Sequence, residues 1–168
     1  MTMFFTSQQP EATVQLGKQI ASLLKPGMVV ALEGDLGTGK TVISRGIAWG
    51  LGVTSPVTSP TFTVAQEYAL PGNRFLYHLD MYRIDDENSA LAFGIDEFLF
   101  TPNAITIVEW PERIRGLLAA DQRLLNIHLQ HVNEIQRRLE IPDAFAEKLC
   151  KAGLPEGISI SSAKETLS

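Results

Sequence analysis

One short segment of this sequence has the residue types and spacing to hold a chain of phosphates. Residues 34–41 match the pattern G-x-x-x-x-G-K-[ST] without a gap. Glycines permit backbone conformations closed to other residues, so successive N–H groups can turn inward around an anion. Lys40 can then reach the β- and γ-phosphates, and the Thr41 hydroxyl can bind Mg²⁺. The residues predicted to hold the nucleotide are Asp35, Leu36, Gly37, Thr38, Gly39, Lys40 and Thr41.

The elements on either side of this loop decide between a nucleotide site and a chance match. Residues 28–33 are an apolar run of strand length, and its lack of alternation predicts a strand buried on both faces. A helical pattern follows from about Lys40 to Leu51, and Gly52 is a suitable stop. A strand, a glycine-rich turn and a helix in this order are the context that phosphate binding needs.

Two carboxylates are candidates for the rest of the chemistry. Nucleotide hydrolysis needs an acidic group that holds Mg²⁺ or orients the attacking water. Glu109 ends the apolar run 104–108, and Asp80 ends the run 75–79. Either residue alone could be a surface acid at a strand end. Beside a phosphate loop, we expect at least one of them to be catalytic together with Lys40.

The remaining elements predict an α/β fold. Further strands are expected at 2–5, as a short edge strand, at 63–68 and 74–80, joined by a turn at 71–73, and at 124–130 and 137–141. Further helices are expected at about 10–24, 89–93 and from 143. Alternating strands and helices predict a single domain with a mostly parallel central sheet, helices on both faces and an antiparallel edge. We assign residues 1–154 to this domain and residues 155–168 to a polar tail that is a candidate for disorder.

Composition narrows the class of protein. The chain has 168 residues, a net charge of −5 and a pI of about 5.2, which argues against a surface built to hold nucleic acid. Its single cysteine, Cys150, excludes an intrachain disulfide. The apolar runs are shorter than the ~20 residues that span a bilayer, and the N-terminus lacks the features of a signal peptide. These features predict a cytoplasmic protein.

Four blocks, in order, resemble the TsaE family, the ATPases of the bacterial machinery that makes N6-threonylcarbamoyladenosine in tRNA. They are residues 34–41, 58–62, 78–83 and 108–111, and the resemblance runs from about residue 6 to residue 141. The resemblance implies ATP and Mg²⁺ as cofactors and ATP hydrolysis that is slow alone and stimulated by partners. The implied partners are the metalloprotein that transfers the threonylcarbamoyl group and its paralogue, with tRNA reached indirectly through that complex.

The resemblance also implies roles for single residues. It suggests that Thr41 and Glu109 hold Mg²⁺ and that Asp80 orients water or the metal shell. It places the base of the nucleotide near Pro10 and gives the loop 59–61 a switch-like role. Two departures are visible. Thr38 replaces a usual Ala or Ser, and residues 134–135 are Glu-Ile where the family often has Gly-Arg, which leaves a late contact to the nucleotide in doubt.

Other functions and other roles stay open on the sequence alone. A small-molecule kinase usually needs an arginine-rich lid, whereas the arginines here are scattered: Arg83, Arg113, Arg115, Arg123, Arg137 and Arg138. A GTP switch needs an Asn-Lys-x-Asp segment, which the chain lacks. A non-enzymatic nucleotide sensor remains an alternative. We expect His78 to be packed beside its strand and Trp110 to serve either packing or function. Arg83 could supply charge to the transition state or anchor the strand end in a salt bridge, and the anchor is slightly favoured.

Overall fold

The chain forms two units, each assembled from discontinuous segments, in a computed structural model that describes residues 1–119 and 121–161. The first unit combines Met1–Leu23, Gly34–Leu51 and the described residues from Ile127 onward. The second combines Leu24–Glu33 and Gly52–Asn126. The glycine-rich loop therefore belongs to the first unit and both candidate carboxylates belong to the second. A single domain over residues 1–154 stays a prediction.

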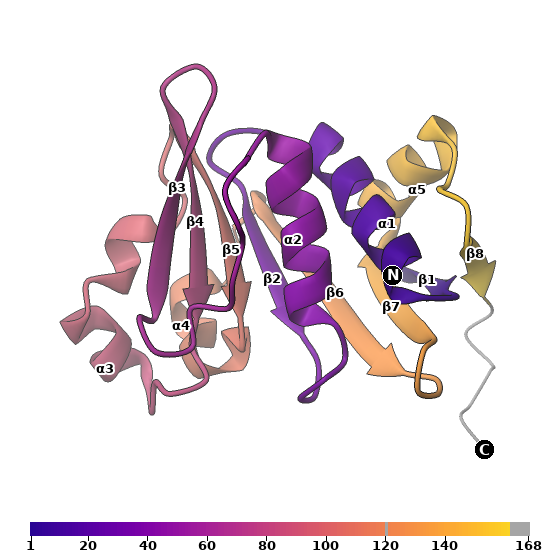
Figure 1. Cartoon of the computed structure of the whole chain (residues 1–168). Helices are drawn as coiled ribbons and strands as arrows, with labels where there is room; N and C mark the ends of the chain where they lie inside the picture. Colours follow the sequence, from indigo (N-terminus) through magenta and orange to yellow (C-terminus); the bar gives the residue numbers. More distant parts are fainter. Residues whose placement is uncertain (120, 162–168) are drawn as a thin grey trace. The chain divides into compact units, whose positions relative to one another are not determined.

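The second unit is built on four strands in the order β3-β4-β5-β2. β2 (Val29–Glu33), β5 (Ala104–Glu109) and β4 (Arg74–Asp80) run parallel, side by side in Figure 1. All six residues of β5 are buried, as expected for an apolar strand covered on both faces. β3 (Ala65–Leu70) pairs antiparallel with β4 through the turn at residues 71–73. The predicted α/β class, with parallel strands and an antiparallel edge, is confirmed.

Short helices and one apolar core complete the second unit. α3 (Glu87–Ala92) begins where the Asp86 side chain accepts a hydrogen bond from the Ser89 amide, which is ordinary helix capping. The 3-10 helices η1 (Ile95–Phe98) and η2 (Pro111–Ile114) and the single turn α4 (Arg115–Leu118) were not foreseen. The core that they help to cover includes Val29, Leu79, Met81, Val108, Ile95 and Ile114. It supports the two strands, β4 and β5, that end in the candidate carboxylates.

The strands of the first unit follow the order β6-β7-β1-β8 and pair antiparallel. β6 (Leu124–His131) enters this unit at Ile127 and pairs with β7 (Arg137–Pro142). The strand predicted at residues 2–5 is present as β1 (Thr2–Ser7), but its predicted edge position is wrong, because β1 lies between β7 and β8. β8 (Ile158–Ser161) falls within the segment assigned to a polar tail, and residues 162–168 of that segment lie outside the described residues.

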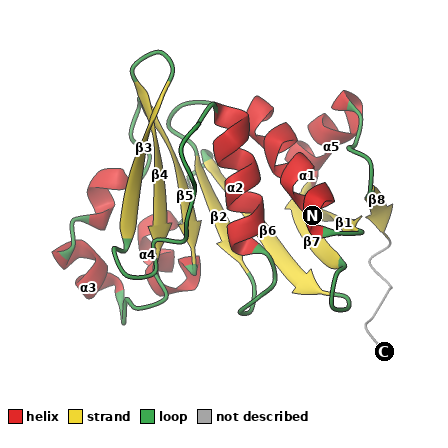
Figure 2. Cartoon of the chain, in the orientation of Figure 1, coloured by secondary structure: helices red, strands yellow, loops and turns green. Residues whose placement is uncertain are grey.

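The helices of the first unit are α1 (Pro10–Leu23), α2 (Lys40–Leu51) and α5 (Asp143–Ala152). α1 and α2 lie side by side in Figure 2 and touch through glycines. A Cβ atom at Gly46 would lie 2.3 Å from the carbonyl oxygen of Val14, and one at Gly17 would lie 2.7 Å from that of Ile43. The two backbones can therefore pack this closely only because both positions lack a side chain.

Among residues 1–119 and 121–161, the helices are all too short or too polar to cross a membrane.

Candidate functional site

The glycine-rich loop occupies residues 34–39, between the end of β2 and the start of α2. The strand–loop–helix context predicted for it is confirmed. Its glycines at 34, 37 and 39 have φ values of 150°, 78° and 100°, a region that favours glycine. A Cβ atom at Gly34 would lie 2.6 Å from both the Leu129 carbonyl oxygen and Thr38 Oγ1. The loop conformation therefore depends on glycine both for its dihedral angles and for space.

Lys40 turns its ammonium back over the loop. The residue is 6% exposed, and its Nζ donates hydrogen bonds to the carbonyl oxygens of Gly34 and, at 2.9 Å, Asp35. Thr38 Oγ1 donates to the same Asp35 carbonyl at 2.8 Å and tightens the turn. An anionic phosphate chain requires positive charge and N–H donors. Here the buried Lys40 ammonium, the glycine-dependent loop backbone and the N-terminus of the twelve-residue helix α2 can supply them. The residues of the loop thus fit such a group.

Two side chains from the far end of the sequence also contact the loop. His131 Nε2 lies 3.3 Å from the Leu36 carbonyl oxygen, and an Arg137 guanidinium nitrogen donates to the Gly37 carbonyl oxygen at 3.3 Å. The sequence analysis gave neither residue a role and left a late contact in doubt. A basic side chain from β7 therefore reaches the loop even though residues 134–135 depart from the family pattern.

Pro10, expected near the nucleotide base, is the first residue of α1 and is exposed. Its missing N–H suits this position, since the first amides of a helix have no partner within the helix. α1 is in turn held against α2, the helix that Lys40 begins.

Asp80 and Glu109 are the last residues of two adjacent parallel strands and lie directly opposite each other in the register of β4 and β5. They are 5% and 3% exposed. Because strands in parallel register end at the same edge, the two carboxylates share one end of the sheet. The prediction that each ends an apolar strand is confirmed, and their catalytic and metal-binding roles stay predictions.

Asp80 fixes the Ser/Thr/Pro segment that the sequence singled out. Its Oδ2 accepts hydrogen bonds from Ser59 Oγ and Thr61 Oγ1, both at 3.3 Å, while its Oδ1 accepts from the Tyr82 amide at 2.9 Å. Val64, where the segment joins β3, has a φ of 66°, an unfavourable conformation for a β-branched residue. The conformation of residues 59–61 is therefore coupled to the orientation of the Asp80 carboxylate.

Glu109 has a buried partner that the sequence analysis missed. His78 Nε2 lies 2.6 Å from Glu109 Oε2, and the His78 residue is 1% exposed. His78 and Asp80 are two residues apart on β4, so they face the same side of the strand. That spacing was a signal in the sequence, but only the pairing of β4 with β5 shows that Glu109 lies alongside them.

Aromatic side chains surround the ends of these strands. Trp110 directly follows Glu109 with a φ of 58°, and its ring centroid lies 5.1 Å from that of Tyr82. The half-buried indole also packs against the core of the second unit. The Arg83 guanidinium lies 4.7 Å from the ring centroid of the exposed Phe62, an arrangement typical of a cation–π contact. Arg83 thus contacts the ring of Phe62, next to Thr61.

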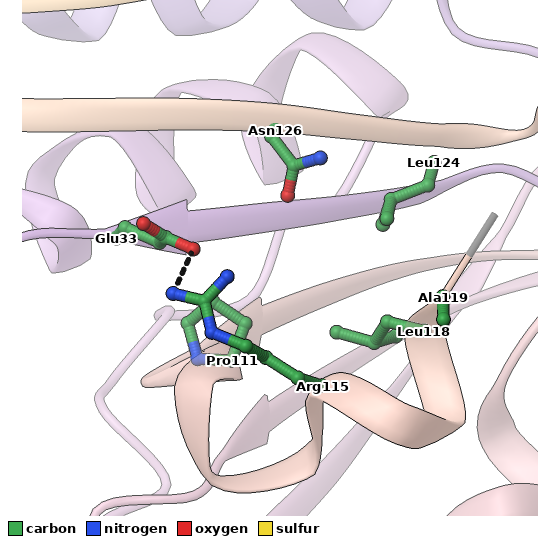
Figure 3. Close-up of a pocket in the computed structure, with 7 residues that line it drawn as sticks. All are labelled: Glu33, Pro111, Arg115, Leu118, Ala119, Leu124 and Asn126. Atoms are coloured by element: carbon green, nitrogen blue, oxygen red, sulfur yellow. Dashed lines mark ion pairs between the residues drawn. The ribbon is translucent and has the colours of Figure 1, made fainter. Parts of the chain in front are cut away.

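A separate cavity of about 290 Å³ lies within the second unit (Figure 3). Figure 3 shows the Arg115 side chain pointing toward Glu33, and their ion pair spans 3.1 Å. The lining residues are Glu33, Pro111, Arg115, Leu118, Ala119, Leu124 and Asn126. This lining includes none of the residues that the sequence predicted for the nucleotide or the metal, so the cavity does not belong to the candidate site.

These features define a class: an α/β protein with a glycine-dependent anion loop between a strand and a helix, and with two buried carboxylates at the ends of parallel strands. Comparison with known families makes the class specific. The family model described as threonylcarbamoyl adenosine biosynthesis protein TsaE matches residues 7–139. The chain belongs to the TsaE family, which has a role in tRNA threonylcarbamoyladenosine biosynthesis.

Individual relatives agree with this membership. The tRNA threonylcarbamoyladenosine biosynthesis protein TsaE of Bacillus subtilis is 42% identical over 133 residues, which are 77% of this chain and 78% of the relative. The protein of the same name from Synechocystis is 40% identical over 121 residues, 69% of this chain and 74% of the relative. The crystal structure of YdiB from Bacillus subtilis is similar with a TM-score of 0.74 and 31% identity, covering 90% of this chain and 96% of that one.

Proposed function

We propose that this chain is the ATP-binding and ATP-hydrolysing subunit required for N6-threonylcarbamoyladenosine modification of tRNA. The observation that carries the ATPase part is the buried Lys40 ammonium, held over a loop whose conformation requires glycine. Membership of the TsaE family supports the tRNA part. In this proposal the protein acts in the cytoplasm and uses ATP to drive the cycle of the threonylcarbamoyl-transferring complex.

The phosphates are bound by the residues of the loop. Its amides and the N-terminus of α2 surround the phosphate oxygens, and Lys40 exchanges its contacts with the loop carbonyls for contacts with the phosphates. Thr41 and Glu109 are the residues proposed to hold Mg²⁺, which when bound would neutralise charge on the β- and γ-phosphates. Hydroxyl and carboxylate oxygens are ligands that Mg²⁺ prefers.

Asp80 is proposed to orient the attacking water. Its carboxylate is buried and already held by three donors, so its direction is fixed before any substrate arrives. The loop 59–61 donates two of those hydrogen bonds. A rearrangement of this loop would remove them and so change the orientation of the Asp80 carboxylate, which supports a switch-like role for the loop. Segments that order or disorder with the γ-phosphate report nucleotide state in this manner.

The proposed partners are the metalloprotein that transfers the threonylcarbamoyl group and its paralogue. A partner that binds only one state of the loop 59–61 would sense ATP, and hydrolysis would release it. The net charge of −5 supports an arrangement in which tRNA is held mainly by those partners.

The test is tRNA modification in vitro by the transferase and its paralogue, with this protein added or omitted. We expect repeated turnover only when this chain and ATP are both present, and we expect Lys40→Ala to remove it. Steady-state ATP hydrolysis by the isolated chain should be slow and should rise when the partners are added. Many cycles of modification without this chain, or full support by Lys40→Ala, would show that the proposed role is wrong.

A further inference from the structure

The buried contact between His78 and Glu109 gives the imidazole one defined hydrogen-bonding role. An ionised carboxylate, the form that could hold Mg²⁺, only accepts, so in this form the 2.6 Å contact has His78 Nε2 as the donor and Glu109 Oε2 as the acceptor. The two residues come from adjacent parallel strands, whose pairing fixes the distance between their backbones. Hydrogen bonds that involve a charged partner are shorter and stronger than those between neutral groups.

The environment of the second ring nitrogen, His78 Nδ1, argues against a purely packing role for the imidazole. His78 Nδ1 is buried and has no hydrogen-bond partner among the described residues. An unpaired buried polar atom destabilises a fold, and buried side-chain nitrogens are normally satisfied. An apolar residue at this position of β4 would avoid that destabilisation. The histidine therefore contributes something that a purely packing residue would not, and its hydrogen bond to Glu109 is that contribution.

We propose that His78 is a positioning residue that holds the Glu109 carboxylate in the orientation used during ATP hydrolysis. This inference rests on the proposed function, since it assigns His78 a role in the same reaction. A glutamate side chain has three rotatable bonds, and a hydrogen bond to one carboxylate oxygen selects among the resulting orientations. A partner of this kind that orients a functional side chain typically changes activity by about 10- to 100-fold when it is removed.

Two substitutions separate positioning from packing. His78→Leu fills the space and removes the donor, whereas His78→Gln places an amide nitrogen near the position of Nε2 and keeps a donor. In single-turnover hydrolysis by the full chain, we expect His78→Leu to lower the rate about 10- to 100-fold and to change the ATP dissociation constant by less than about threefold. We expect His78→Gln to recover at least a third of the wild-type rate.

A double-mutant cycle identifies the residue through which His78 acts. If the imidazole works through Glu109, His78→Leu should slow hydrolysis in the wild-type background and have little further effect in a Glu109→Gln background. A purely packing role would instead give equal losses in both backgrounds and equal losses for Leu and Gln. Thermal unfolding of each variant, monitored by circular dichroism, shows whether the fold is retained.

The outcomes also separate this inference from the function on which it rests. Lys40→Ala and Glu109→Gln should each abolish or greatly reduce hydrolysis if the proposed function is right. If both do so while His78→Leu hydrolyses ATP at the wild-type rate, the positioning role of His78 is wrong and the proposed function stands. If Lys40→Ala and Glu109→Gln hydrolyse ATP at the wild-type rate, the proposed function itself fails, and the role of His78 with it.

Discussion

Among the described residues, the side chains of Lys40, Asp80 and Glu109 are buried acids or bases, and each has at least one hydrogen-bonding partner. Burying a charge is unfavourable unless partners compensate for the lost water. Lys40 contacts loop carbonyls, Asp80 contacts two hydroxyls and an amide, and Glu109 contacts His78. Buried charged groups held in this way are more typical of a functional site than of a core, where apolar residues of similar volume give comparable stability.

The carboxylates should affect turnover much more than binding. We expect Glu109→Ala to lower the rate of ATP hydrolysis about 100-fold or more while the ATP dissociation constant changes little. The reason is that the loop amides and Lys40 supply most contacts to the bound phosphates, whereas a strand-end carboxylate acts on the metal or the water. Asp80→Ala should also slow hydrolysis.

Hydrolysis rates and calorimetric ATP affinities of the two variants test this prediction, with Glu112→Ala as a matched control. Glu112 is an exposed acid three residues after Glu109 and should tolerate the change. If both Asp80→Ala and Glu109→Ala hydrolyse ATP at the wild-type rate with the partner complex present, neither carboxylate takes part in the reaction.

A second prediction at this scale concerns pH. Hydrogen bonds from the side chain and backbone amide of Arg123 lower the pKa of Asp121 to about 2, from a usual value of 3.8. A carboxyl whose pKa is lower in the folded state than in the unfolded state adds stability above the unfolded pKa. That contribution is lost as the pH falls through the folded pKa.

The free energy of unfolding should therefore be higher for the wild type than for Asp121→Asn at pH 5–7, and the difference should shrink between pH 4 and pH 2. Because the pair is partly exposed, the difference should be small and should fall further in high salt. Urea unfolding at a series of pH values measures it. A difference that stays constant from pH 7 to pH 2 would contradict the assignment.

The sequence could predict the loop residues but not all of their neighbours. Residues 34–41 are contiguous, so the pattern together with its flanking segments was sufficient to predict a loop between a strand and a helix; nucleotide binding by these residues stays a prediction. His78 and Arg137 were missed because their partners lie 31 and 100 residues away along the chain. Contacts at such separations depend on which strands pair and in what register. Strand pairing and register cannot be read directly from a single sequence.

At the scale of elements, the best-predicted segments are those with a strong internal pattern. The bounds of α2, β4 and β5 agree with the prediction, because each is a continuous apolar or amphipathic run that ends at a defined residue. β8 was missed because it is four residues long and alternates two isoleucines with two serines inside a polar segment. β1 was placed at an edge because strand order is not encoded in the pattern of any one strand.

The packing of α1 against α2 predicts that a glycine-to-alanine substitution within a helix lowers the free energy of unfolding, the opposite of the usual effect. Replacing glycine by alanine within a helix normally stabilises it by about 1 kcal/mol. At Gly46 the added methyl group would overlap the Val14 carbonyl oxygen, so α1 and α2 would have to separate. Overpacking of this kind destabilises by about 1–3 kcal/mol, and we expect Gly46→Ala to be destabilising by that amount.

Chemical denaturation of Gly46→Ala and of Gln15→Ala, a change at an exposed position of α1, measures this effect. The control should be neutral or slightly stabilising. Because α2 begins at Lys40, a shift of this helix should also weaken nucleotide binding by Gly46→Ala at temperatures where the variant is folded. A variant as stable as the wild type would show that the two helices can separate without loss.

For the whole molecule, net charge and family membership point in the same direction. A protein that binds tRNA by itself normally carries a basic surface, because neutralisation of phosphates dominates affinity for nucleic acid. This chain has 19 acidic and 14 basic side chains, not counting histidine. The acidic composition supports the proposal that other proteins hold the tRNA and that this chain supplies energy to them.

Nucleotide binding should be visible in the stability of the whole molecule. A ligand that binds only the folded state stabilises it by mass action, by about 2.7 kcal/mol at a concentration 100 times its dissociation constant. For a chain of this length that free energy corresponds to a rise in Tm of roughly 5–10 °C. We expect ATP with Mg²⁺ to produce this rise in the wild type and GTP to produce a smaller one.

Lys40→Ala should lose the rise, because the substitution removes the buried ammonium beside the loop. Arg115→Ala is the matched control. It removes a largely exposed guanidinium that pairs with Glu33, so it should change the Tm without ligand only slightly and keep the full response to ATP. Thermal unfolding at several nucleotide concentrations measures these shifts, and calorimetry supplies the dissociation constants. Equal or larger stabilisation by GTP would contradict the assignment of adenine. An undiminished response in Lys40→Ala would show that the nucleotide is not bound by the loop.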